Sequence, residues 1–381
     1  MGRQGVFVNN LSGYKSFKPS NLKNVENQLI IDSEINNLII TIHENLAKIN
    51  TMSDIIVDID RFLYAYVYEE AVESSRIEGT ECTMEDIFFN IKNEKLKNEK
   101  KITDIRETIS NIKAIEEGVE KLNVLPLSTR FFKEIHKILL NNVRGENKNP
   151  GEIRITQNWI GASSIKDAVF IPPNIEDMNE SLKDLDNYIN NEEQTIDKLI
   201  KTALIHYQFE TIHPFLDGNG RLGRIIILLY LIKEKLLLKP TLYMSYYLKI
   251  HQVEYYNKLM EVRINDKYEE YIKFFLYCLN ETTKSTIKKI NNINELHKKN
   301  LAKLPIINRK KNLYKKLFEY IEKNPIFNIR EVQNDINVSY NSVKTAVEKF
   351  EELGIIKQNN NIKRNKIYTY EEYIALFKNV K

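Results

Sequence analysis

The chain has 381 residues, of which 56 are Lys or Arg and 52 are Asp or Glu, and its formal net charge at pH 7 is +4. Because 42% of the residues are hydrophobic, the chain can bury real cores, and its length suits two or three domains. This composition excludes a disordered, collagen-like or coiled-coil protein. With only two cysteines, Cys82 and Cys278, a disulfide framework is excluded and a reducing compartment is expected. No apolar run resembles a signal peptide or a membrane span, so a cytoplasmic protein without membrane contact is predicted.

The N-terminal part is predicted to be an irregular arm followed by two helices. Residues 1 to about 25 show no periodic pattern and are expected to become ordered only by packing on another part of the chain. Apolar residues three and four apart then predict helices over Asn27 to Leu63 and over Ile59 to Arg76. Gly79 suits the left-handed position that ends such a helix.

The middle of the chain is predicted to be helical with one exception. Periodic apolar faces cover Leu127 to Val143, Ile175 to Asn190, Ile196 to Ile212, Gly223 to Lys235, Tyr246 to Arg263 and Tyr268 to Leu296. The exception is Ile153 to Pro173, where two apolar stretches flank a polar loop at residues 162–167 and predict a β-hairpin. Pro172-Pro173 ends it, because proline cannot continue a strand ladder.

Residues 301–381 are basic, with 16 Lys or Arg against 9 Asp or Glu. Three short helical patterns and a two-stranded ribbon predict a winged helix-turn-helix. The helical patterns are Leu313 to Ile321, Ile329 to Ile336 and Ser339 to Leu353, and the ribbon lies between Gly354 and Tyr368. Two roles stay open: DNA binding through residues 339–345 together with Lys363, Arg364 and Lys366, or protein docking, which Glu348, Glu351 and Glu352 favour.

The most distinctive feature is the run HPFLDGNGRLGR at residues 213–224, here named the signature loop, between two apolar helices. Gly218, Asn219 and Gly220 allow successive backbone N–H groups to point one way, and the following helix adds the positive end of its dipole. This pattern predicts an anion-binding cradle. It is neither a Walker A loop nor a Rossmann turn, since it lacks the G-K-[ST] ending and no strand precedes it.

Four charged or titratable side chains of the signature loop complete a phosphate-transfer chemistry. Arg221 and Arg224, three residues apart on the first helical turn, can bind phosphate oxygens in a bidentate manner. Asp217 can hold a Mg²⁺ that bridges phosphates. His213 can accept a proton from an attacking hydroxyl, because the pKa of an ordinary histidine lies near neutral pH.

The signature loop resembles the Fic family signature H-P-F-x-[D/E]-G-N-G-R-x-x-R, and every fixed position is present. Residues 74–79, SSRIEG, resemble the family's inhibitory motif [S/T]-x-x-x-E-[G/N], and residues 150–173 are similar to the hairpin called the flap. The resemblance covers about residues 15 to 300. It implies transfer of AMP from ATP to a Tyr, Ser or Thr hydroxyl of a target protein or of the enzyme itself.

The resemblance also implies a role for each matching residue. His213 would be the general base, and Asp217 would hold Mg²⁺ against the α- and β-phosphates. The anion hole would be formed by Gly218, Asn219 and Gly220, and the outer phosphates would be bound by Arg221 and Arg224. Relatives of the Doc branch, which transfer phosphate, carry Lys where this chain has Gly220, so nucleotidyl transfer is expected.

Two further surfaces follow from the same resemblance. The flap edge near Trp159 and Ile160 would bind a target segment by strand addition. Tyr255 or Tyr256 would line the adenine pocket, although the 21 tyrosines of the chain leave helix packing open as the alternative.

Residues 74–79, here named the inhibitory segment, are expected to restrain the activity. A glutamate at a helix C-terminus opposes the helix dipole and favours a cationic partner. In relatives with this motif the glutamate pairs with the second arginine of the loop, here Glu78 with Arg224, while the first serine, here Ser74, contacts Asn219.

The predicted fold is therefore mainly α: a Fic-type helical core with a β-hairpin flap, and a C-terminal winged helix-turn-helix. We expect an N-terminal helical region at 1–100 with the inhibitory segment, a catalytic core at 101–300 with the flap at 151–173, and a winged-helix domain at 301–381. A homodimer is expected by analogy with relatives. The alternative function is a DNA-binding regulator whose Fic-like core senses nucleotide with little turnover.

Overall fold

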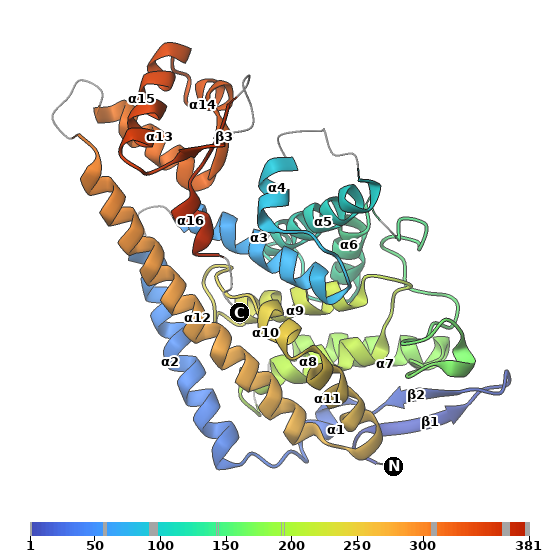
Figure 1. The fold of residues 1–381 in the computed structure, drawn as a ribbon. Coiled ribbons are helices and arrows are strands. Elements are labelled where there is room, and N and C mark those ends of the chain that lie inside the picture. Colours follow the sequence, from blue (N-terminus) through green and yellow to red (C-terminus); the bar gives the residue numbers. More distant parts are fainter. Residues whose placement is uncertain are drawn as a thin grey trace.

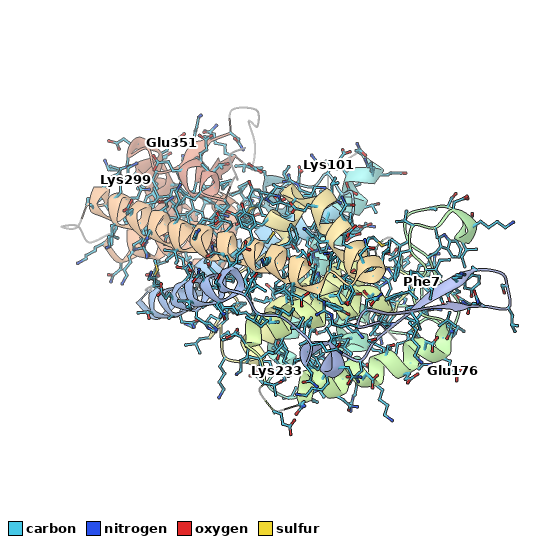
Figure 2. The ribbon with its side chains drawn as sticks, turned by 90° about the horizontal axis from the view of Figure 1, so that it is seen from below. Phe7, Lys101, Glu176, Lys233, Lys299 and Glu351 are labelled. Carbon is cyan, nitrogen blue, oxygen red and sulfur yellow. The ribbon has the colours of Figure 1, made fainter. Side chains whose placement is uncertain are left out.

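The computed structural model describes residues 2–55, 59–90, 98–141, 143, 145–191, 193, 195–305, 311–359 and 366–377. These residues form a mainly helical molecule, as the sequence predicts, with short strands toward both chain ends (Figure 1). Figure 2 shows Phe7 and Glu176 toward one end of the molecule, and Lys299 and Glu351 toward the other end. None of the described helices is both long and apolar enough to cross a membrane.

Two adjacent helices form the centre of the core. Nearly every residue of α8 (Lys198–Ile212) and of α9 (Asn219–Lys233) is buried. A helix that is apolar around its whole circumference is stable only inside a protein, so the loop joining α8 and α9 is held within the core. The sequence predicts both helices, but α9 begins at Asn219 rather than at Gly223, with Gly218 in the left-handed conformation (φ 75°) as its N-cap.

Helices on all sides enclose this pair, and Figure 1 shows α2 and α12 side by side along one flank. The single predicted helix over Tyr246 to Arg263 is wrong, because the backbone of His251 (φ −103°, ψ 26°) divides it into α10 and α11. The sequence analysis predicts no element at α4 or α5. The enclosing helices are α2 (Ser33–Ile55), α3 (Ile59–Ile77), α4 (Met84–Asn90), α5 (Glu99–Lys121), α6 (Thr129–Leu139), α7 (Ile175–Asn190), α10 (Ser245–Ile250), α11 (Gln252–Asn265) and α12 (Tyr268–Lys303).

The N-terminal segment has regular structure, so the predicted irregular arm is wrong. Strands β1 (Gly5–Asn9) and β2 (Lys15–Pro19) pair antiparallel with Phe7 opposite Phe17, and the short helix α1 (Leu22–Glu26) follows. Phe17 is fully buried, and its amide donates to the carbonyl of Ile171 in the flap (3.0 Å). Contacts with the distant flap help to order this segment. The local sequence pattern cannot predict these contacts.

The flap differs from the predicted β-hairpin. Its described β pairing is one antiparallel bridge between Ile160 and Phe170, and a 3₁₀ turn at Ile165–Asp167 occupies the loop. Gly161 (φ 86°) turns the chain directly after the bridge. Before the bridge, Asn158 donates hydrogen bonds to the signature loop instead of to a facing strand. The chain reversal is therefore present, but the strand ladder is not.

Residues 311–359 and 366–377 form a smaller unit at the end of α12. Its elements are α13 (Lys311–Lys323), β3 (Ile326–Asn328), α14 (Ile329–Ile336), α15 (Tyr340–Glu352), β4 (Lys357–Gln358), β5 (Ile367–Thr369) and α16 (Glu371–Ala375). The three predicted helices are present, and β3 joins the predicted ribbon to give an antiparallel sheet in the order β3-β5-β4. The unit packs on the core, since Asn300 donates to the Tyr370 hydroxyl (2.7 Å) and the rings of Phe377 and Tyr66 are 5.9 Å apart. The winged-helix interpretation of this unit stays a prediction.

Candidate active site

His213 lies where α8 ends. It is the C-cap of the helix and has a left-handed backbone conformation (φ 49°, ψ 60°), which is uncommon for a residue other than glycine. Its Nδ1 lies 3.4 Å from the carbonyl oxygen of Glu210. Because a carbonyl oxygen only accepts, Nδ1 carries the proton of the neutral ring and Nε2 keeps a lone pair. Burial lowers the pKa of His213 to about 4, so the ring is neutral at pH 7 and can accept a proton.

The flap binds the backbone carbonyls of the signature loop. Arg154, which is buried, donates from Nε to the carbonyl of His213 (3.0 Å), and its backbone amide donates to Pro214 (2.9 Å). Asn158 Nδ2 donates to the carbonyls of His213 (3.2 Å) and Phe215 (3.0 Å). These bonds fix the backbone of the loop, and the first N–H groups of α9, which lack intrahelical acceptors, are the groups able to bind an anion.

His136 of α6 fixes the far side of the loop. Its Nε2 donates to the carbonyl of Asp217 (2.9 Å), its Nδ1 accepts from the amide of Gly151 (2.9 Å), and its ring stacks on Phe215 with centroids 3.8 Å apart. Burial lowers the pKa of His136 to about 4, which keeps the one tautomer able to make both bonds. The sequence analysis missed this histidine, because its hydrogen-bond partners lie 15 and 81 residues away.

The side chain of Asn219 closes the loop on itself. Its Oδ1 accepts from the amide of Phe215 (2.9 Å), and its Nδ2 donates to the carbonyl of the same residue (2.8 Å). Both bonds hold the tight turn that contains Gly218. At Gly220, a Cβ atom would lie only 2.6 Å from Glu78 Oε1, so a side chain there would displace the glutamate.

Arg221 is a cation of the loop whose hydrogen-bonding groups are only partly used. Its side chain is 3% exposed, and its closest carboxylate oxygens, on Asp217 and Glu107, are each 3.7 Å away. Within the described part of the chain, its Nε and Nη1 have no hydrogen-bond partner. Buried guanidinium N–H groups favour an anionic partner, so this side chain indicates a binding position for a negatively charged ligand.

Asp217 is the carboxylate of the loop. Its Oδ1 accepts from the amide of Gly218 (2.6 Å), and its side chain is 38% exposed. No group of three or more His, Cys, Asp or Glu suited to a metal ion is found among the described residues. A cation at Asp217 would therefore take most of its ligands from a bound substrate or from water.

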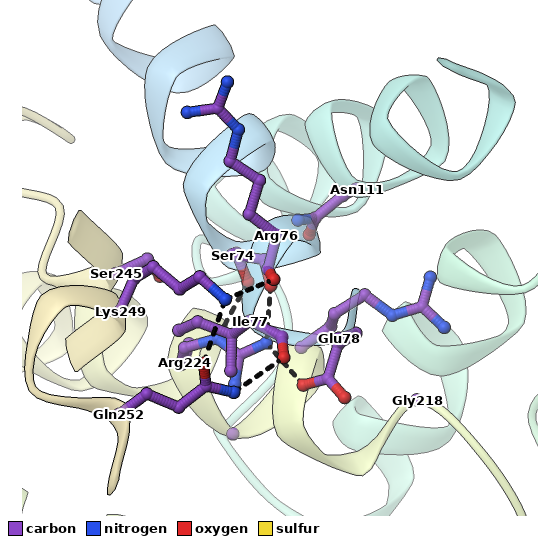
Figure 3. Close-up of polar contacts among 12 residues, drawn as sticks. Ser74, Arg76, Ile77, Glu78, Asn111, Gly218, Arg224, Ser245, Lys249 and Gln252 are labelled. Carbon is purple, nitrogen blue, oxygen red and sulfur yellow. Dashed lines mark hydrogen bonds and ion pairs between the residues drawn. The ribbon is translucent and has the colours of Figure 1, made fainter. Parts of the chain in front are cut away.

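The inhibitory segment meets the signature loop at Arg224. The guanidinium donates from Nη2 to Glu78 Oε1 (2.8 Å) and to the carbonyl of Ser74 (2.9 Å), and from Nε to Ser74 Oγ (2.9 Å) (Figure 3). Burial is the largest single influence and raises the pKa of Glu78, but the charge and hydrogen bond of Arg224, together with the charge of Arg221, outweigh burial and hold that pKa below its usual value. The expected contact of Ser74 with Asn219 is wrong, because Ser74 bonds to Arg224 and the Asn219 side chain is occupied by Phe215. Gly79 has a φ of 93°, as its position after a helix predicts.

The remaining expected site residues lie around this centre. Tyr255 is buried with its hydroxyl 2.8 Å from Nε2 of His206, whereas Tyr256 is 44% exposed. Only Tyr256 therefore presents an appreciable surface to a ligand. In the flap, Trp159 is partly exposed and donates from its indole to the carbonyl of Ala162 (3.0 Å). Both backbone polar groups of Ile160 bond across the flap.

The expected DNA-binding surface is only partly described. Tyr340, Asn341, Lys344 and Thr345 are exposed on α15, but Lys344 lies 3.7 Å from Glu348 on the same helix. Lys363 and Arg364 lie outside the described residues, and Lys366 is exposed just before β5. A lysine that pairs with a neighbouring glutamate contributes less to phosphate binding, so this surface gives no support to a nucleic-acid role.

Comparisons with known proteins match two parts of the chain to one family. Residues 126–231 match the Fic/DOC family, and residues 36–120 match the Fic/DOC family N-terminal region. The protein adenylyltransferase fic-1 of Caenorhabditis elegans is 32% identical over 122 residues, 31% of this chain and 22% of that protein. A probable protein adenylyltransferase of Aquifex aeolicus is 41% identical over 70 residues, 18% of this chain and 22% of that protein. The chain thus matches only about a fifth of the length of these curated relatives.

Two solved structures share the fold over most of their length. A Fic family protein from Desulfovibrio desulfuricans G20 covers 90% of this chain and 97% of its own, with a TM-score of 0.57 and 18% identity. A Fic domain containing signaling protein from Bacteroides thetaiotaomicron covers 68% of this chain and 97% of its own, with a TM-score of 0.54 and 18% identity. At this level of identity the comparison shows the fold alone.

Proposed function

The chain belongs to the Fic/DOC family, and from this premise we propose that it is an auto-inhibited protein adenylyltransferase. It transfers AMP from ATP to a Tyr, Ser or Thr hydroxyl of a target protein or of itself. The observation that carries the proposal is the convergence of His213, Asp217, Arg221 and Arg224 on one loop, with Glu78 bonded to Arg224 at 2.8 Å.

In this proposal His213 is the general base. Its neutral ring accepts the hydroxyl proton of the target at Nε2 while the hydroxyl oxygen attacks the α-phosphorus of ATP. The bond from the α-phosphorus to the bridging oxygen breaks, pyrophosphate leaves, and AMP remains bound to the target as an ester. The Nδ1–H that faces the Glu210 carbonyl and the fixed backbone of His213 support this role, because they hold the ring in the required tautomer.

The phosphates of ATP lie against the first turn of α9. The backbone N–H groups at Gly218, Asn219 and Gly220 form the anion hole, and that of Gly218 also donates to Asp217 Oδ1. The guanidinium Nε and Nη1 of Arg221, which have no hydrogen-bond partner among the described residues, support a contact with an outer phosphate. Arg224 supplies a second such contact when Glu78 no longer bonds to it. Because these groups are held before ATP binds, little reorganisation precedes the reaction.

Mg²⁺ fits this site as a partner of ATP. Mg²⁺ prefers one or two carboxylates with substrate oxygens and water, and Asp217 offers one partly exposed carboxylate beside the anion hole. When bound, the ion neutralises phosphate charge on the leaving pyrophosphate. Asp217 in turn is oriented by the amide of Gly218 and, through its own carbonyl, by His136.

Glu78 restrains the reaction by occupying Arg224. A phosphate oxygen and the Glu78 carboxylate compete for the same guanidinium, so ATP binds in the reactive pose only when the inhibitory segment moves away. The short distance from the Gly220 Cβ position to Glu78 Oε1 supports this competition, since it brings the carboxylate to the surface of the anion hole.

The target segment binds along the flap. Both backbone polar groups of Ile160 bond to the facing side of the flap, so the backbone polar groups of Trp159, the residue before it, face the opposite edge. A target strand paired along this edge would carry its hydroxyl toward His213, whose carbonyl is already bonded to Asn158, the residue before Trp159.

Intact-mass spectrometry of the full chain incubated with ATP and Mg²⁺ tests the proposal. We expect an AMP adduct on Glu78→Gly protein or on an added lysate target, and no adduct on the double variant Glu78→Gly/His213→Ala. If the adduct is equally abundant in both variants, His213 is not the base. If no adduct forms on any protein and the chain shows salt-sensitive DNA binding, the regulator that senses nucleotide is the better function.

A further inference from the structure

Two side chains from α10 and α11 hold the C-terminal end of α3. Lys249 Nζ donates to the carbonyl of Arg76 (2.8 Å), and Gln252 Nε2 donates to the carbonyl of Ile77 (3.0 Å). Lys249 also donates to Gln252 Oε1 (2.9 Å), so the two side chains act as one connected unit (Figure 3). We name Lys249 and Gln252 the carbonyl clamp.

The clamped carbonyls are the last two of α3 and directly precede Glu78. The final carbonyls of a helix lack intrahelical partners and carry the negative end of the helix dipole. The ammonium group of Lys249 adds a second hydrogen bond to the Arg76 carbonyl and compensates the dipole, and the amide of Gln252 bonds to the Ile77 carbonyl. The amides of Glu78 and Gly79 bond only within the turn, to the carbonyls of Ser75 and Arg76.

The direction of Glu78 is set by this helix end. A change in the final turn of α3 moves the glutamate relative to Arg224, to which it is joined by a single carboxylate oxygen at 2.8 Å. Gln252 Nε2 also lies 3.3 Å from the hydroxyl of Tyr256, the partly exposed tyrosine expected near the nucleotide base. The carbonyl clamp therefore connects the inhibitory segment to the helix that borders the nucleotide site.

We propose that Lys249 and Gln252 are positioning residues of the inhibitory segment, and that loss of the carbonyl clamp releases Glu78 from Arg224 and raises AMP transfer. The inference rests on the proposed function. It assigns control of the activity to two residues that touch neither Arg224 nor the signature loop in the described hydrogen bonds.

The test compares initial rates of AMP incorporation from labelled ATP by the full chain. Lys249→Met and Gln252→Leu keep the side-chain size but remove the donors, and each should raise the rate about tenfold over wild type. Lys258→Met, a lysine of α11 without a described contact to α3, is the matched control and should leave the rate unchanged. Lys249→Arg keeps a donor and should stay near the wild-type rate.

The same substitutions in Glu78→Gly protein separate the clamp from other effects. Because that protein has no carboxylate to position, neither clamp substitution should raise its rate further. Deuterium uptake by a peptide covering residues 74–82 should also be faster in Lys249→Met than in Lys258→Met. The proposed role of the carbonyl clamp is wrong if Glu78→Gly is faster than wild type but the clamp variants are not. It is also wrong if the clamp substitutions raise the rate of Glu78→Gly protein further. If Glu78→Gly itself is no faster than wild type, the proposed inhibition fails instead.

Discussion

The signature loop and the inhibitory segment meet at Arg224, but the fold holds them in different ways. Backbone carbonyls of the loop are bonded by the buried side chains of Arg154 and His136 and by the partly buried side chain of Asn158. The inhibitory segment is the end of a helix, and its glutamate keeps about a third of its side chain exposed. The proposed catalytic geometry is therefore built into the core, whereas the contact proposed to restrain it involves a partly exposed side chain at a helix end.

This difference predicts opposite responses to substitution. Changes in the loop should lower AMP transfer whether or not Glu78 is present, whereas changes in the inhibitory segment should raise it only while the loop is intact. Each loop variant below is therefore best measured in Glu78→Gly protein, where the inhibitory contact does not mask the result.

After His213→Ala, which should abolish the reaction, the largest loss is expected from Asp217→Ala. This substitution removes the carboxylate proposed to hold Mg²⁺ at the phosphates, so the rate should fall about 100-fold or more. A titration of Mg²⁺ against the initial rate checks this, with Asp184→Ala on α7 as the control. An unchanged Mg²⁺ dependence in Asp217→Ala would show that Asp217 is not the metal ligand.

Arg154→Met should have the next largest effect. It removes the guanidinium donor from the carbonyls of His213 and Pro173, which we expect to cost about 3 kcal/mol of stability and to lower the rate tenfold or more by displacing His213. Thermal unfolding and initial rates measured together check this. Arg130→Met, an exposed arginine whose described partner is Glu134 at 3.8 Å, should change neither quantity.

His136→Phe should give a smaller loss. The substitution keeps the stacking on Phe215 but removes both hydrogen bonds, so we expect kcat to fall about tenfold with KM for ATP nearly constant. His136→Gln, which can still donate and accept, should lose less. Equal losses in the two variants would show that the hydrogen bonds to Asp217 and Gly151 do not position the loop.

The smallest effect on the rate of AMP transfer is expected from lowering the pH. Burial lowers the pKa of His213 from its ordinary value of 6.5 to about 4, so the base stays neutral as the pH falls through 6.5. The rate should therefore be nearly constant from pH 8 to 6 and decline only toward pH 4. A rate profile with a midpoint at pH 6.5 or above would mean that His213 is not the neutral, buried base described here.

The sequence predicts the helices and the signature loop better than it predicts the segments held by distant contacts. The pattern of α8 and the glycines after it is local, so their positions follow from periodicity and backbone freedom. The strands β1 and β2 were missed because burial of Phe17 depends on the flap, more than 150 residues away. Two apolar stretches around a polar loop predict a hairpin for the flap, but Asn158 bonds to the signature loop instead of to a facing strand.

The same distinction holds within the site. Glu78 and Arg224 could be matched as a pair because both belong to recognisable motifs. The roles of His136 and Lys249 could not be predicted, because each depends on backbone groups that three-dimensional packing brings near it. A side chain that bonds to a distant carbonyl leaves no spacing pattern in the sequence.

The central claim is that Glu78 restrains AMP transfer through its contact with Arg224. The most direct measurement is the initial rate of AMP incorporation by wild type, Glu78→Gln and Glu78→Gly at saturating ATP and Mg²⁺. We predict that both variants exceed wild type at least tenfold, since Gln keeps the shape of the side chain but loses the charge that binds the guanidinium. Equal rates in all three proteins would contradict the account.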